Sequence, residues 1–224
     1  MELNTHHFSY NILQQPIESF YHRLRVSASK IFKLVDEEIK NKNIYNPKNG
    51  HIIELENKEE FELFQETLRN LNNIVYFNSL LLGSYSIFET SFKHICEFVE
   101  KHSNTNLKPF SPGRKILHYC RQYLSDSKLV DFTRKEIDSK YTYLTEVNEL
   151  RNLIAHYNGN LIKEKGKSLE HQPDYKQFHK KHLTIMNNGQ VYINDDVYIK
   201  QFIKISEDFI KLIINELKKN GSVV

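Results

Sequence analysis

The sequence predicts an all-α protein, an up-and-down bundle of about five or six helices with a small β-hairpin before the C-terminal helix. Apolar residues recur at three-to-four spacing over long, proline-poor stretches, as amphipathic helices require. Alternating apolar residues beside an Asn-Gly turn occur just once with a clear pattern, at residues 183–193. The chain of 224 residues is long enough to bury one sizeable core.

We therefore expect a single domain over residues 1–224 with four successive parts. The predicted parts are an N-terminal helix and turn (1–57), core helices (58–159), a basic loop and hairpin (160–193) and a C-terminal helix (194–219).

The N-terminal helix is expected to open at Pro16, since proline is accepted in the first turn of a helix. Its apolar stripe continues at helical spacing from Ile17 to Ile39. The turn cluster 46–50 follows, and we expect a small hairpin between residues 44–45 and 52–53.

Residues 58–102 contain no proline and predict one long helix or two helices stacked end to end. The middle of this stretch is apolar on most faces, which indicates burial, and Gly83 within it suggests a close contact with another helix. Glu89 is an acid among apolar neighbours; a buried carboxylate needs a partner, and Arg151 is the candidate. The alternative places Glu89 on a solvated strip.

Ser111 followed by Pro112 predicts the start of a short helix that ends near Leu124. Another helix is expected over residues 133–157, with Gly159 as a stop just beyond it. Its core face consists of apolar residues at helical spacing: Leu144, Val147, Leu150 and Ile154. In the final helix we expect Asn194 as the N-cap, with Asp195 and Asp196 in the first turn.

The composition limits the functional classes. A net charge of +3 and a pI near 8.6 permit local RNA contacts without demanding them. Cys96 and Cys120 are too few for a disulfide framework, and no Cys/His cluster has zinc-site spacing. No signal sequence or membrane-spanning apolar run occurs, so we expect a cytoplasmic protein with no cofactor and no membrane partner.

Arg151, Asn152 and His156 form the one constellation with chemical potential. A guanidinium can hold a phosphate through two parallel hydrogen bonds, and an imidazole exchanges protons near neutral pH. Together these groups suit phosphodiester chemistry. Among the arginines, Arg151 alone has a histidine five residues further on.

Ideal helix geometry places Asn152 and His156 about 40° apart on the non-core face, and Arg151 about 140° from His156. One helix alone is thus a poor active site. Two copies packed antiparallel about a twofold axis would bring two Arg151 and two His156 to one cleft. We therefore expect a homodimer.

Arg151-Asn152-x3-His156 at the end of an amphipathic helix resembles the HEPN superfamily, whose signature is Arg-x4-6-His. Residues 85–89 resemble the preceding core helix, where some members carry an acid, here Glu89. The similarity covers roughly residues 60–219. It implies a bundle that dimerises through the motif helices and acts as a metal-independent endoribonuclease, with Arg151, Asn152, His156 and Glu89 as site residues.

Members of the HEPN superfamily serve as toxins, in phage defence and in RNA processing, so the resemblance also implies a possible antitoxin or regulatory partner. In HEPN toxins paired with a nucleotidyltransferase antitoxin, the motif continues to a tyrosine that receives the nucleotide. Asn158 stands at that position and Tyr157 comes one residue early, which puts this mode of silencing in doubt.

Four alternatives stay open at this point. The basic loop 160–183 could hold an RNA backbone through Lys176, Lys180 and Lys181, with Tyr175 and Phe178 available for stacking on a base. Its histidines could be imagined as metal ligands, although their spacing favours a solvated loop. The chain could also be a non-catalytic helical dimerisation or protein-interaction module, or an enzyme that stays silent until triggered.

Overall fold

The structure is a computed structural model, and it divides the chain into two compact units that are described separately. The first unit comprises residues 1–24, 82–152 and 200–224, and the second comprises residues 25–81 and 153–199. The residues that the structure describes are 15–19, 21–27, 29–30, 33, 37, 43–45, 52–54, 73–102, 109–111, 115–162, 168–172, 175–178 and 182–220.

The N-terminal predictions are confirmed where the chain is described. Residues 15–19, which include Pro16, and residues 21–27 are helical as expected, and residues 1–14 lie outside the described part. The small hairpin is also present: β1 (Asn43–Tyr45) pairs antiparallel with β2 (Ile52–Glu54), with Ile44 opposite Ile53.

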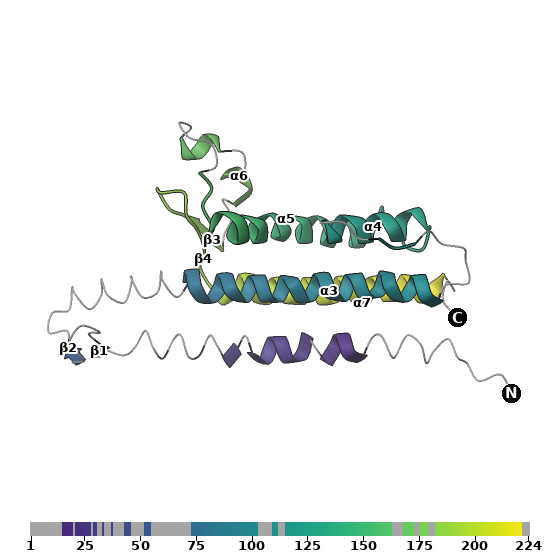
Figure 1. The fold of residues 1–224 in the computed structure, drawn as a ribbon, viewed down its shortest axis with the longest axis horizontal. Coiled ribbons are helices and arrows are strands. Elements are labelled where there is room, and N and C mark those ends of the chain that lie inside the picture. The colour runs from purple at the N-terminus through teal and green to yellow at the C-terminus, as the bar shows by residue number, and fades with distance from the viewer. Residues whose placement is uncertain are drawn as a thin grey trace. The chain divides into compact units, whose positions relative to one another are not determined.

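Long helices build the first unit: α3 (Asn78–His102), α4 (Ile116–Asp126), α5 (Lys135–Tyr157) and α7 (Asp196–Lys219). α3 and α7 lie side by side, and α5 runs in the opposite direction to both (Figure 1). Buried aromatic rings join α3 to α7, with Tyr85 stacked on Phe202 at 5.8 Å and Phe92 edge-on to Phe209 at 5.3 Å. The side-chain amide of Asn220 donates to the Leu129 carbonyl oxygen at 2.7 Å, tying the end of α7 to the turn before α5.

The all-α prediction with a hairpin before the C-terminal helix is therefore confirmed. The core helix differs in its first described turn, because residues 73–77 form a π-helical segment, η1, ahead of α3. Residues 58–72 lie outside the described part. The contact predicted at Gly83 is wrong: Gly83 is exposed, and a Cβ built there would meet no described atom within 4 Å.

The start of α4 was also predicted wrongly. The helix begins at Ile116 with Lys115 as its N-cap residue, so the described Ser111 lies outside it. The N-cap makes no side-chain hydrogen bond. Arg121 of α4 is half-buried, with its guanidinium 4.5 Å from the centroid of the Tyr141 ring, so this cation packs against α5.

The second unit contains the predicted strong hairpin. β3 (Leu183–Ile185) pairs antiparallel with β4 (Val191–Ile193), and Gly189 in the turn has φ +82°. α5 stops where predicted: Gly159 has φ +77° and donates its N–H to the Leu153 carbonyl oxygen at 3.1 Å.

The predicted cap of the last helix lies one residue away from Asn194. Asp195 accepts the backbone N–H of Val197 at 3.0 Å, which makes Asp195 the capping side chain. Of the helices that the structure describes, none has the length and apolar character to cross a membrane.

Candidate functional site

α5 separates its apolar and polar residues as the sequence indicated. Leu144, Val147, Leu150 and Ile154 are buried, which fixes the rotation of the helix about its axis. A second stripe at spacings of four, three and four residues consists of Tyr141, Thr145, Asn148 and Asn152. This second stripe lines a cleft in the first unit, and Arg151 stands beside it.

Arg151 contacts both residues that the sequence associated with it. Its Nη2 lies 3.8 Å from Oε2 of Glu89 on α3, so the predicted ion pair is present. Its Nη1 donates a hydrogen bond of 2.9 Å to the side-chain oxygen of Asn152. The guanidinium carbon is 5.8 Å from the centroid of the Tyr85 ring. These three groups hold Arg151 in one orientation.

The described residues do not accept all the hydrogen bonds that the Arg151 guanidinium can donate. Nε is buried without a hydrogen-bond acceptor among the described residues, and the contact with Glu89 is too long for a strong hydrogen bond. The Arg151 side chain keeps 29% of its surface exposed, whereas Glu89 keeps 15%. Arg151 therefore retains donor capacity for an external anion.

Burial raises the pKa of Glu89 above its usual value of 4.5, and the positive charge of Arg151 opposes that rise without cancelling it. The neighbouring Tyr85 hydroxyl is buried without a described partner, and burial raises its pKa strongly. The phenol is therefore neutral across the physiological range. The Glu89 carboxyl therefore binds a proton more tightly than an exposed glutamate does.

Glu89→Gln is expected to change how stability depends on pH. Because the folded pKa of Glu89 is raised, its contribution is fully present below pH 4.5 and is lost as pH rises through the folded value. The free energy of unfolding of wild type minus variant should fall as pH rises from about 4 to 7, measured by urea unfolding. Hydrogen bonding with Arg134 lowers the pKa of Glu216, so Glu216→Gln is a control of opposite sign. A difference for Glu89→Gln that grew with pH would contradict the expectation.

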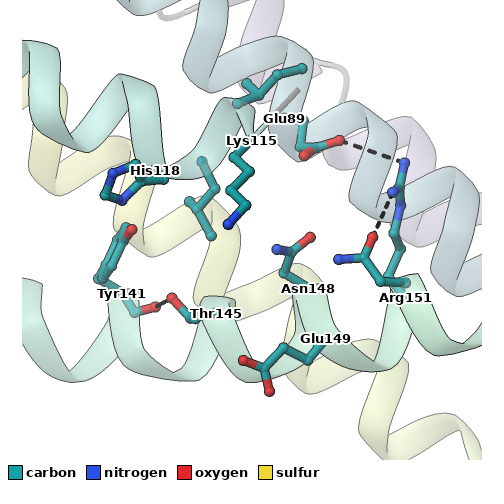
Figure 2. Close-up of a pocket in the computed structure, with 11 residues that line it drawn as sticks. Glu89, Lys115, His118, Tyr141, Thr145, Asn148, Glu149 and Arg151 are labelled. Carbon is teal, nitrogen blue, oxygen red and sulfur yellow. Dashed lines mark hydrogen bonds and ion pairs between the residues drawn. The ribbon is translucent and has the colours of Figure 1, made fainter. Parts of the chain in front are cut away.

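The cleft beside Arg151 has a volume of about 390 Å³. α5 forms one wall, and the N-cap residue Lys115 with the first residues of α4, Ile116–His118, forms the other, with Glu89 of α3 at the end near Arg151 (Figure 2). Asn148 and Lys115 extend toward each other across the middle, whereas His118 and Tyr141 lie together at the far end (Figure 2). Two cations, two carboxylates, two amides and an imidazole therefore share one cleft.

His156 is exposed in the last turn of α5, within the second unit. Tyr157 beside it is 51% exposed. The structure thus brings together Arg151, Asn152 and Glu89, and it leaves the fourth predicted site residue on the surface.

The basic loop contains short ordered elements: the 3-10 helix η2 (Leu169–His171) and α6 (Tyr175–Phe178). Lys176 is exposed, and Lys180 and Lys181 lie outside the described residues. The idea that Phe178 stacks on a base is wrong, because this ring is buried at 3% exposure.

The described histidines of this loop have protein partners. His171 shares a hydrogen bond of 2.6 Å with Ser168, and His182 contacts Asp195 at 2.9 Å. Within the described ranges, no group of three or more His, Cys, Asp or Glu side chains could hold a metal ion.

Comparison with protein-family models, with curated proteins and with solved structures finds no match to this chain.

Lys115, His118 and Asn148 were not predicted as site residues. Asn148 had a signal in the sequence, since it precedes Arg151 by three positions and Asn152 by four on one helix. The other two come from a separate helix, and nothing in their local sequence relates them to Arg151.

Proposed function

We propose that this chain is a metal-independent endoribonuclease of the HEPN type, acting as a homodimer. The observation that supports it best is the environment of Arg151. Its guanidinium is oriented by Glu89 and Asn152, has hydrogen-bond donors that the described residues do not accept, and lies at the edge of a cleft. The same helix carries an exposed His156 five residues later.

In the proposed reaction the ribose 2′-hydroxyl is the nucleophile, so no metal-bound water has to be generated. A His156 imidazole takes the 2′-hydroxyl proton while the 2′-oxygen forms a bond to phosphorus. The bond to the 5′-oxygen breaks, and that oxygen receives a proton from the second His156 of the dimer. Arg151 stabilises the charge on the phosphoryl oxygens, and the products are a 2′,3′-cyclic phosphate and a 5′-hydroxyl end.

The surface of the second unit supports the dimer. Several large apolar side chains are exposed there. Tyr157 and Ile162, the latter 45% exposed, lie at or just after the end of α5, and Met186, 40% exposed, lies in the β3–β4 turn. Asn160 pairs with Gln190 beside the β3–β4 turn, which brings the segment after α5 to that turn. Exposed apolar surface of this kind favours contact with another protein surface.

A toxin or phage-defence setting in the cytoplasm follows from the same resemblance, with RNA as substrate and an antitoxin or regulatory protein as a further partner. The exposed apolar residues also support a second candidate function, a non-catalytic dimerisation or protein-interaction module. RNA cleavage separates the two functions, since an interaction module would associate and leave RNA intact.

The wild-type protein should cut single-stranded RNA in the presence of EDTA and leave 2′,3′-cyclic phosphate ends. Products are read by gel and mass spectrometry, and sedimentation velocity at the same concentrations should show a dimer. Arg151→Ala protein purified in parallel controls for contaminating nuclease. Cleavage by a monomer, or cleavage that EDTA abolishes, would contradict the proposal. So would a stable dimer that does not cut RNA and whose expression does not impair growth.

A further inference from the structure

We infer that the cleft between α4 and α5 is a subsite for one unpaired nucleotide next to the phosphate that Arg151 holds, with Lys115 and Asn148 as its binding residues. The inference rests on the proposed ribonuclease function and extends it to the substrate. The cleft lies entirely within the first unit of one chain, so this subsite does not need the dimer partner.

The size of the cleft favours a nucleotide. About 390 Å³ lies near the lower end of the range for small-molecule pockets, which accommodates a base with its sugar but not a base pair with both strands. A strand that places a base in this cleft must therefore present it unpaired and unstacked from its neighbours.

The polarity of the cleft changes along its length in the order that a nucleotide requires. Arg151 and Lys115 provide cationic groups at one end and in the middle, where a phosphate and sugar would lie. The exposed His118 imidazole lies at the far end and offers a flat surface for a base, beside Tyr141, whose buried ring packs against Arg121 (Figure 2). Asn148 lies between them with a side-chain amide that can both donate and accept hydrogen bonds.

The charge balance favours a phosphodiester over a multiply charged nucleotide. Lys115 and Arg151 are opposed by Glu89, which is paired with Arg151, and by Glu149, which is exposed and directed away from Lys115 in Figure 2. A cleft with nearly balanced charge suits a ligand with a single negative charge per nucleotide. An RNA strand has that charge, whereas a free nucleoside triphosphate carries several.

Binding of a labelled single-stranded 2′-O-methyl dodecanucleotide tests the inference, because this probe lacks the nucleophile and cannot be cleaved. We expect Lys115→Glu to weaken its binding about tenfold and Asn148→Ala about fivefold in fluorescence anisotropy. Lys135→Glu makes the same charge change at an exposed position of α5 outside the cleft and should stay within about twofold. The annealed duplex of the probe should bind at least about tenfold more weakly.

The inference is overturned if both cleft variants bind the probe as the wild type does, if the duplex binds as tightly as the single strand, or if the wild type fails to bind. Circular dichroism verifies that each variant is folded. Cleavage assays on His156→Ala keep the two ideas apart: retained probe binding with lost cleavage supports both. Undiminished cleavage by this variant, together with lost binding in Lys115→Glu, would contradict the proposed catalytic role of His156 and still support the nucleotide subsite.

Discussion

His156→Ala is expected to lower the rate of RNA cleavage by about 10²–10⁴, the usual contribution of general acid–base catalysis. The imidazole is exposed and outside the core, so its removal should leave the thermal unfolding temperature and the dimer unchanged. Single-turnover cleavage of a labelled RNA measures the rate, and sedimentation velocity measures the oligomer.

His94→Ala is the matched control for this variant, since His94 is also an exposed helical histidine but lies on α3, away from the motif. Its cleavage rate should equal that of the wild type. If His156→Ala cut RNA at the wild-type rate while free of contaminating nuclease, acid–base catalysis by His156 would have to be abandoned.

Arg151→Ala is expected to reduce cleavage by about 10²–10³, the usual loss when a donor that stabilises transition-state charge is removed. This variant also leaves Glu89 half-buried without its cation, so it should lose stability. Arg151→Lys separates the two effects. A lysine keeps the positive charge near Glu89 but cannot reproduce the planar fork, so stability should largely return while the cleavage rate stays low.

Asn152→Ala completes this series because Asn152 contacts Arg151 through a hydrogen bond of 2.9 Å. We expect a smaller rate loss than for Arg151→Lys, since Asn152 orients the guanidinium, and Asn152→Asp should restore the acceptor. Full cleavage activity in Arg151→Lys would show that a point charge suffices, and that the planar guanidinium is not required to stabilise the phosphoryl oxygens.

Much of the candidate site could be predicted because helical periodicity constrains it. The buried stripe through Leu144 and Ile154 fixes the rotation of α5, which in turn determines where Arg151 and Asn152 lie. The Glu89–Arg151 pair was predictable because an acid among apolar neighbours needs a cation. Gly159 was predictable as a stop because the end of a helix often needs a positive φ.

Other features could not be predicted, because competing local choices are nearly equal in energy. Asn194 and Asp195 are both good capping residues, and it is Asp195 that accepts the backbone N–H of Val197. Ser111-Pro112 has the pattern of a helix start, yet α4 begins four residues beyond Pro112. Gly83 suggested a close helix contact, but a glycine can also occupy an exposed position in a helix.

The sequence by itself determined the helical class, the hairpin before α7, the stop at Gly159 and the position of Arg151 and His156 on one helix. Each of these depends on residues close together along the chain, where spacing and backbone preferences decide. Tertiary structure alone brought Lys115, the N-cap residue of α4, and His118 of α4 opposite Asn148 of α5 and so formed the cleft. That arrangement depends on how two helices pack, and no local pattern in either helix specifies which polar side chains will face each other.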